Sequence, residues 1–207
     1  MSDRMALKIA IDLMHVPSQV RLVRSEPLPG DVATLLQIAA GDEKVEGAAV
    51  GMTGRSRPVV RDAATFFIEQ ILFAPESDSY RVLGARAQAS AGELRRNVAL
   101  LLRWLHPDMD PDGERSIFIG RVTAAWNDLK TPERRAAYDE MLRSSRERDG
   151  DRRNSRKFRF GRTRTSKRLN SDGSYRNRSS RRPRRGLDAT GFWRRVLSVL
   201  FDRPLVR

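Results

Sequence analysis

Three consecutive residues, His106, Pro107 and Asp108, have side chains that could act on another molecule. Proline fixes the backbone φ angle and therefore restricts the shape of the loop that contains it. An exposed aspartate beside it can accept a bidentate hydrogen bond from an arginine of a partner protein. The tripeptide therefore suits a docking loop, and the alternative interpretation is an ordinary turn that ends a helix.

The composition excludes several kinds of reactive site. The chain of 207 residues has no cysteine, which excludes disulfides, thiolate zinc sites and cysteine nucleophiles. Two histidines, His15 and His106, leave little room for a histidine-rich metal site or a Ser-His triad. We assign no role to His15, and we expect no metal, no cofactor and no catalytic residue.

Two further patterns are similar to ligand-binding loops but lack key residues. The acidic stretch Asp108, Asp110, Asp112 and Gly113 is similar to the start of an EF-hand. However, Ile119 stands where the calcium loop needs glutamate, and Pro111 is badly placed, so the calcium interpretation is the weaker one. The glycines at 47, 51 and 54 lack the Gly-Lys-Ser/Thr of a phosphate loop and are interpreted as turn residues.

Helical patterns are expected on both sides of the tripeptide. Ser90 and Glu93 form a Ser-x-x-Glu capping box, which predicts a helix that ends just before the tripeptide. Prolines then break the chain into a loop. The expected helices are a short one that Gly84 ends, one over about 91–105, one over about 114–129, and one that begins at Thr131-Pro132.

This arrangement resembles the J domain of the DnaJ (heat-shock protein 40) co-chaperone family. The residues that carry the resemblance are Asp-Ser-Tyr-Arg-Val-Leu-Gly at 78–84, His106-Pro107-Asp108, and Glu-Arg-Arg-Ala-Ala-Tyr-Asp at 133–139. The resemblance implies a four-helix J domain over 78–143, with two antiparallel helices joined by the tripeptide loop. We therefore expect an all-α protein.

The resemblance also implies a function. J domains dock on a DnaK-type heat-shock-seventy chaperone and stimulate its ATPase, so this chain would be a co-chaperone and not an enzyme, with no small-molecule substrate. Its chaperone-binding residues would be His106, Pro107 and Asp108 in the loop, with Arg95, Arg96 and Arg103 on the preceding helix. A basic helix face steers association with an acidic surface.

The predicted helix before the loop departs from the family pattern. The basic face is thinned to three arginines, and Leu100 and Trp104 extend the apolar stripe sideways. We predict that these two side chains pack on the preceding part of the chain, on the helix over 66–73.

Residues 1–75 carry no chemical signal. Prolines at 17, 27 and 29 argue against one long helix, and we expect an irregular segment over 1–30. Apolar residues at helical spacing, separated by glycines, predict a small module of two or three helices over 31–75.

The formal net charge of +14 is concentrated in one segment. Residues 143–186 contain 18 Arg and Lys against 4 Asp and Glu, which accounts for the whole excess. Because almost nothing there can be buried, we expect a disordered Arg-rich segment over 144–186, followed by a short amphipathic helix over 187–207. Side chains that could contact nucleic acid or a membrane are Arg152, Arg153, Arg156, Lys157, Arg162, Arg164, Lys167, Arg168, Arg181, Arg182, Arg184 and Arg185.

The simplest interpretation of this basic tail is a solvated linker, but other functions are open. It could bind nucleic acid or a ribosome through phosphate contacts, with the J-like helices as a scaffold. It could also join the apolar stripe of 187–207 in attaching the protein to a membrane surface, although the shortness of this stripe favours contact of that helix with protein. No apolar run approaches the roughly 20 residues of a membrane span, and the N-terminus is a poor secretory signal, so we expect a cytoplasmic protein, with peripheral membrane attachment as the alternative.

Overall fold

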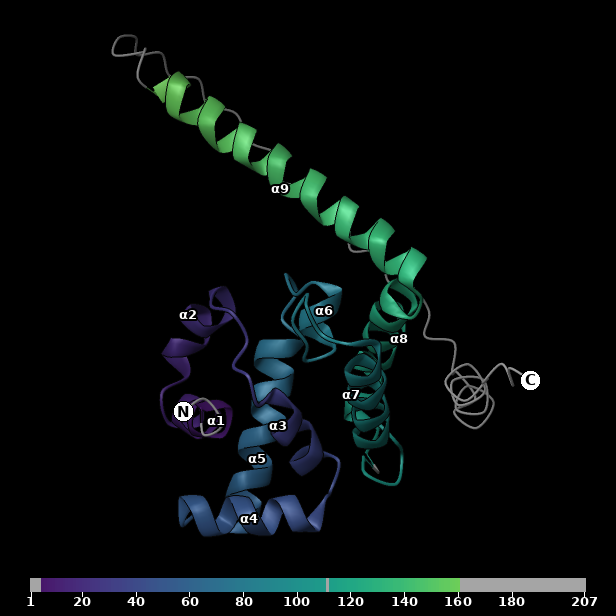
Figure 1. Cartoon of the computed structure of the whole chain (residues 1–207). Coiled ribbons are helices and arrows are strands. Elements are labelled where there is room, and N and C mark those ends of the chain that lie inside the picture. The colour runs from purple at the N-terminus through teal and green to yellow at the C-terminus, as the bar shows by residue number, and fades with distance from the viewer. Residues whose placement is uncertain (1–4, 111, 161–207) are drawn as a thin grey trace, which may run out of the picture. The chain divides into compact units, whose positions relative to one another are not determined.

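The structure, a computed structural model, describes residues 5–110 and 112–160, and every regular element among them is helical (Figure 1). This confirms the all-α prediction. The chain divides into two compact units between Tyr138 and Asp139, which are described separately below. In the first unit the elements are α1 (Met5–His15), η1 (Pro17–Gln19), α2 (Val20–Ser25), α3 (Val32–Ala39), α4 (Glu43–Thr53), α5 (Arg57–Phe67), η2 (Ile68–Leu72), α6 (Ser79–Val82), α7 (Ala91–Trp104), η3 (Glu114–Phe118), α8 (Ile119–Leu129) and the beginning of α9 (Pro132–Phe160).

Residues 5–25 are mostly helical, in α1, η1 and α2, where the sequence predicted an irregular segment, whereas residues 26–30 are not helical. Ala6 and Ala10 are fully buried, and α1 packs on α5. The backbone N–H of Ala6 donates to Asp31 Oδ1 at 3.0 Å, which gives a partner to one of the free donors at the helix start. Proline shortens the helices here without preventing them, because Pro17 occupies the first position of η1, where no backbone donor is needed.

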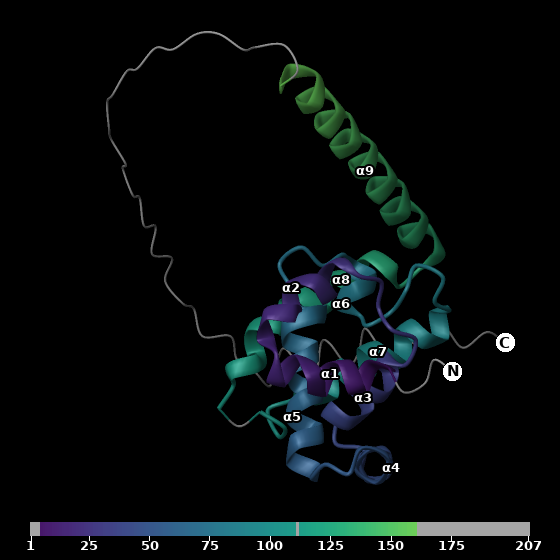
Figure 2. The ribbon, with the colours of Figure 1, turned by 90° about the vertical axis from the view of Figure 1, so that its left-hand side faces the viewer.

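Helix α5 is the centre of the N-terminal helices. It contacts α1, α3 and α4, and it continues as the π-helical turn η2 (Figure 2). Its inward face is completely buried at Val60, Ala63, Ala64 and Phe67, as the apolar spacing predicts. Gly41, which follows α3, has a φ of 77°, a conformation that favours glycine. Residues 31–75 thus contain the helices α3, α4 and α5 and the turn η2.

The helices over 78–138 follow the predicted order. Asp78 and Ser90 cap α6 and α7, each accepting a hydrogen bond from a backbone N–H three residues later. Helix α7 packs on α8, and α6 packs on α8. The expected single helix over 114–129 is divided, because its first turn is the 3₁₀ segment η3 and the α-helix begins at Ile119.

Arginines join the two halves of the first unit. Arg81 donates to the carbonyls of Val23 and Glu26 at 2.9 and 2.8 Å, and Arg86 donates to the carbonyl of Leu28. These acceptors lie in the last turn of α2 or in the segment that follows it. The expected boundary between a module ending at 75 and a domain starting at 78 therefore does not separate two compact units.

Helix α9 is longer than expected. Its first turns are tied to α6: the backbone N–H of Ser79 donates to the hydroxyl of Tyr138 at 2.7 Å, and Arg135 Nε donates to the hydroxyl of Tyr80 at 2.9 Å. The helix continues to Phe160, so 144–160 is helical in the structure although it belongs to the segment predicted to be disordered.

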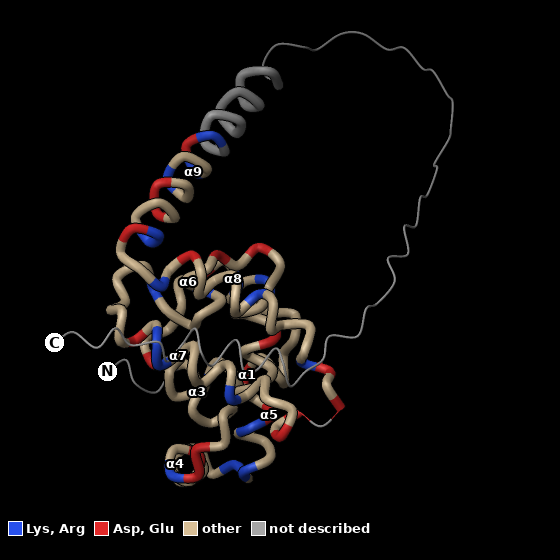
Figure 3. The backbone as a smooth tube through the Cα atoms, turned by 90° about the vertical axis from the view of Figure 1, so that its right-hand side faces the viewer, with Lys and Arg blue, Asp and Glu red and all other residues tan. Residues whose placement is uncertain are grey.

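Local interactions support this extension of α9. Arg143 forms an ion pair with Glu140 at 2.6 Å, and Figure 3 shows both basic and acidic residues along the coloured part of α9. Arginine and glutamate also have good intrinsic helix propensity. The predictions for 161–186 and 187–207 lie outside the described residues.

Candidate functional site

The loop between α7 and η3 presents the tripeptide to solvent. Pro107 and Asp108 are exposed, with 87% of the Asp108 side chain accessible, and His106 is half-buried. The carbonyl of His106 accepts from the backbone N–H groups of Met109 at 2.8 Å and Asp110 at 3.1 Å, which closes a tight turn. The structure therefore places the three residues together at the outer side of an ordered loop.

The imidazole of His106 makes two mutually exclusive contacts. Its Nδ1 lies 3.2 Å from the backbone N of Asp108 and 3.3 Å from the Asp108 carboxylate. Nδ1 accepts the N–H when it carries a lone pair, and it donates to the carboxylate when it carries a proton. Whichever of the two contacts forms, it ties the His106 ring to Asp108 within the tripeptide.

Helix α7 has an exposed face beside this loop. Arg95, Arg96 and Arg103 are all exposed, as is Ala99 between them. Arg96, Ala99 and Arg103 lie three and four residues apart and therefore share one side of the helix. The opposite side is buried, with Leu94 and the other core residues inaccessible. The three predicted arginines are available to a partner from the same direction.

The flank of α7 is covered by the N-terminal helices. Trp104 is 1% exposed, and its ring centroid lies 6.1 Å from that of Phe73 at the end of η2. This confirms the prediction that Trp104 packs on the helix over 66–73. Leu100 is half-buried, and α3 packs along α7 (Figures 1 and 2).

Two residues that shape the loop, Arg115 and Asp110, were not predicted from the sequence to do so. The guanidinium of Arg115 lies 4.9 Å from the centroid of the Trp104 ring and donates to the carbonyl of Met109 at 3.2 Å. Asp110, which is 8% exposed, accepts the backbone N–H of Arg115 at 2.8 Å. The signal was the Asp110-to-Gly113 spacing directly before a helix, which indicates a capping turn as readily as it resembles a calcium loop.

Asn97 is a further buried polar residue of α7. It is 2% exposed, and its side-chain amide donates to the carbonyls of Leu83 and Gly84 at 3.0 and 3.2 Å. These are the carbonyls that follow α6, so the amide fixes α7 against that turn. Its position within an apolar stripe was the signal available in the sequence.

A charge cluster surrounds the base of the loop. Burial raises the pKa of Glu69, on η2, above its ordinary value of 4.5. The guanidinium of Arg115 opposes this effect, whereas the carboxylates of Asp110 and Glu114 add to it. The cluster therefore joins charges of η2 to those that follow the tripeptide.

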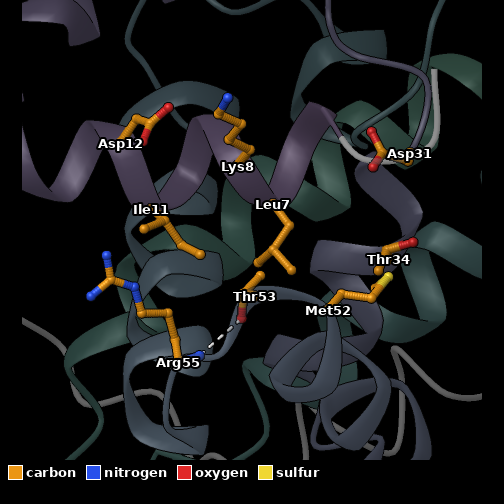
Figure 4. Close-up of a pocket in the computed structure, with 9 residues that line it drawn as sticks. All are labelled: Leu7, Lys8, Ile11, Asp12, Asp31, Thr34, Met52, Thr53 and Arg55. Carbon is orange, nitrogen blue, oxygen red and sulfur yellow. Dashed lines mark hydrogen bonds between the residues drawn. The ribbon is translucent and has the colours of Figure 1, made fainter. Parts of the chain in front are cut away.

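A separate cavity of about 290 Å³ lies between α1, α3 and α4 (Figure 4). None of its lining residues belongs to α7 or to the tripeptide loop. Its apolar side chains and charged rim include Leu7, Ile11, Met52, Lys8, Asp12 and Arg55. Among the described residues, no group of three or more His, Asp and Glu side chains could hold a metal ion.

The structure does not describe the side chains of the basic residues that were predicted to contact nucleic acid or a membrane. Four of them lie in α9, where the structure describes the backbone alone: Arg152, Arg153, Arg156 and Lys157. The other eight lie outside the described residues. Within the described part of the chain, no helix is both long and apolar enough to cross a membrane.

Known proteins match the part of the chain that holds this loop. Residues 78–139 match the family described as DnaJ domain. Chaperone protein DnaJ 1 of Mycobacterium leprae is 40% identical over 68 residues, covering 33% of this chain and 18% of the relative. Chaperone protein DnaJ of Tropheryma whipplei is 44% identical over 62 residues, covering 30% and 17%. Chaperone protein DnaJ of Hydrogenobacter thermophilus is 33% identical over 73 residues, covering 35% and 20%.

These matches define what the chain shares with its relatives. The chain spans about a fifth or less of the length of these DnaJ proteins. No solved structure matches the chain significantly. The family match contains α6, α7, the tripeptide loop, α8 and the start of α9, in the order that the resemblance predicts. Residues 78–139 of this chain are therefore a DnaJ domain.

Proposed function

We propose that this protein is a co-chaperone that docks on a DnaK-type heat-shock-seventy chaperone and stimulates its ATPase. The tripeptide His106-Pro107-Asp108 would contact the partner together with Arg95, Arg96 and Arg103. The observation that carries the proposal is the exposed Asp108 carboxylate on a loop whose turn is closed by hydrogen bonds, within a DnaJ domain. In this proposal ATP is hydrolysed in the partner, and no residue of this chain acts as a catalyst.

In this proposal the chain recognises its partner through charged side chains and carries out no reaction itself. An exposed carboxylate can accept two parallel hydrogen bonds from a partner arginine, which gives directional recognition. The exposed arginines of α7 would raise the rate of encounter with an acidic surface and orient the approach. Because the exposed face of α7 adjoins the loop, one partner surface can contact both.

A single-turnover ATPase assay with a DnaK-type chaperone tests the proposal. We expect the full-length protein to raise the hydrolysis rate and Asp108→Asn to abolish most of the increase, because asparagine lacks the charge and one acceptor oxygen. Asp112→Asn is the matched control, since Asp112 is also exposed and lies in the same loop outside the tripeptide. Equal stimulation by Asp108→Asn and wild type, or no stimulation by either, would contradict the proposal.

We further propose that the basic tail over 161–207 determines where the protein is located and does not contribute to ATPase stimulation. Its excess of positive charge would attract acidic surfaces in a salt-dependent manner. A variant ending at residue 160 should keep the full maximal stimulation, measured in the same assay. Loss of stimulation in this variant would show that the tail takes part in the partner contact itself.

A further inference from the structure

The end of α7 is fixed from two sides. Trp104, its last residue, is buried, and its ring contacts Phe73 of the N-terminal helices and the guanidinium of Arg115 in η3. Phe73 also packs on Phe118, with ring centroids 4.7 Å apart. Arg121 of α8 donates to the carbonyl of Phe73 at 2.6 Å. The start of the tripeptide loop is therefore anchored on residues from three separate elements.

Arg115 links the end of α7 to the tripeptide loop. Its side chain donates to the carbonyl of Met109, the residue directly after the tripeptide, while its guanidinium lies over Trp104. Its backbone N–H donates to the buried carboxylate of Asp110. One residue thus connects the last residue of α7 with the two residues that follow Asp108.

The N-terminal helices also reach the loop directly. The ε-methyl group of Met109 lies against Gly41, where an added Cβ would be 3.2 Å from it. Glu69 of η2 shares the charge cluster with Arg115 and Asp110. Residues before 78, which lie outside the DnaJ family match, therefore contact the loop at both of its ends.

We propose that Phe73, Trp104 and Arg115 form a brace through which the N-terminal helices position the His-Pro-Asp loop for partner docking. In this inference Arg115 is a positioning residue that does not itself contact the partner. A loop already held in its docking geometry loses little conformational entropy when it binds, which favours the complex. The inference rests on the proposed co-chaperone function, and it adds a role for residues outside the DnaJ domain.

The test compares full-length variants at a temperature where circular dichroism shows each to be folded. Arg115→Gln removes the guanidinium, and Arg21→Gln on α2 is a control at an exposed arginine. Arg115→Gln should raise the concentration needed for half-maximal ATPase stimulation about tenfold while leaving the maximal rate nearly unchanged. Arg115→Lys should restore part of the loss, because an ammonium group retains the attraction to the Trp104 ring.

Amide hydrogen exchange provides a readout of loop position that does not depend on ATPase activity. The Met109 and Asp110 amides, which donate to the carbonyl of His106, should exchange faster in Arg115→Gln, with the core of α5 unchanged. Phe73→Leu should move exchange in the same direction, since it weakens the brace from the side of the N-terminal helices.

The outcomes separate the two proposals. If wild type stimulates the partner and Arg115→Gln does so at the same concentrations, the brace is not needed for docking and the inference is overturned. Unchanged exchange at Met109 and Asp110 in both Arg115→Gln and Phe73→Leu overturns it equally. If wild type itself gives no stimulation, the co-chaperone function fails, and the positioning role for docking fails with it.

Discussion

Two carboxylates, Glu69 before the DnaJ match and Glu133 within it, have pKa values that their surroundings shift in opposite directions. Burial raises the pKa of Glu69, so the folded protein holds its proton more tightly than the unfolded chain does. A hydrogen bond from its own backbone N–H, followed by one from the Thr131 side chain, lowers the pKa of Glu133. Ionised Glu69 therefore opposes folding, whereas ionised Glu133 supports it.

The two residues should consequently give opposite pH profiles of stability. Glu69→Gln should raise the free energy of unfolding at neutral pH, and this gain should decline as the pH falls through the raised pKa of folded Glu69 and be absent below the ordinary value of 4.5. Glu133→Gln should lower it at neutral pH, and its deficit should disappear in acid. Urea unfolding between pH 3.5 and 7.5 measures both, and parallel profiles for the two variants would contradict this assignment.

At the scale of elements, the turn after α6 shows how closely the two halves of the first unit approach. Gly84 has a φ of 62°, and an added Cβ would lie 3.0 Å from Val32 Cγ1 and 3.3 Å from Leu36 Cδ1. Glycine is thus needed there both for its backbone conformation and for the approach of α3. Gly54, with a φ of 66°, has the same backbone requirement but open space around it.

Substitution of these two glycines distinguishes the cost of backbone strain from the cost of crowding by neighbouring side chains. Gly54→Ala should cost about 1–2 kcal/mol of stability from the left-handed conformation alone. Gly84→Ala should cost that amount and about 1–3 kcal/mol more, because the methyl group displaces apolar side chains of α3. Chemical unfolding of both variants measures the difference, and equal losses would show that α3 yields to the methyl group without cost.

On the scale of the first unit, the N-terminal helices bury one flank of the DnaJ domain. Trp104 is almost fully buried by contacts that include Phe73, and α3 lies along α7. Removing residues 1–75 would expose this flank to water. The N-terminal helices are therefore part of the same hydrophobic core as α7 and α8.

A fragment over 76–148 should accordingly be much less stable than one over 1–148. Each large apolar side chain that becomes exposed costs about 1.5–3 kcal/mol of hydrophobic stabilisation. Thermal unfolding followed by circular dichroism should show a lower midpoint and a broader transition for the shorter fragment. If the two fragments unfold at the same temperature, the N-terminal helices contribute nothing to the stability of the domain.

The sequence alone was sufficient for the features that depend on local patterns. The capping box at Ser90, the proline-containing loop at 106–108 and the apolar spacing over 31–75 predicted helices, and the sequence motifs predicted the DnaJ arrangement, because each pattern acts within a few turns. The contact of Trp104 with the helix over 66–73 was also predictable, since the side chain extended the apolar stripe beyond the face that a partner helix covers.

Only the tertiary structure decided the features that depend on distant contacts. Helix α1 was missed because its weak pattern is stabilised by burial against α5, and no local signal reports that surface. The roles of Arg115 and Asp110 could not be predicted, because hydrogen bonds to backbone groups and contacts with a ring face have no characteristic residue spacing in the sequence. The loop sequence is thus a local property of the chain, whereas its anchorage is the result of packing between segments far apart in the sequence.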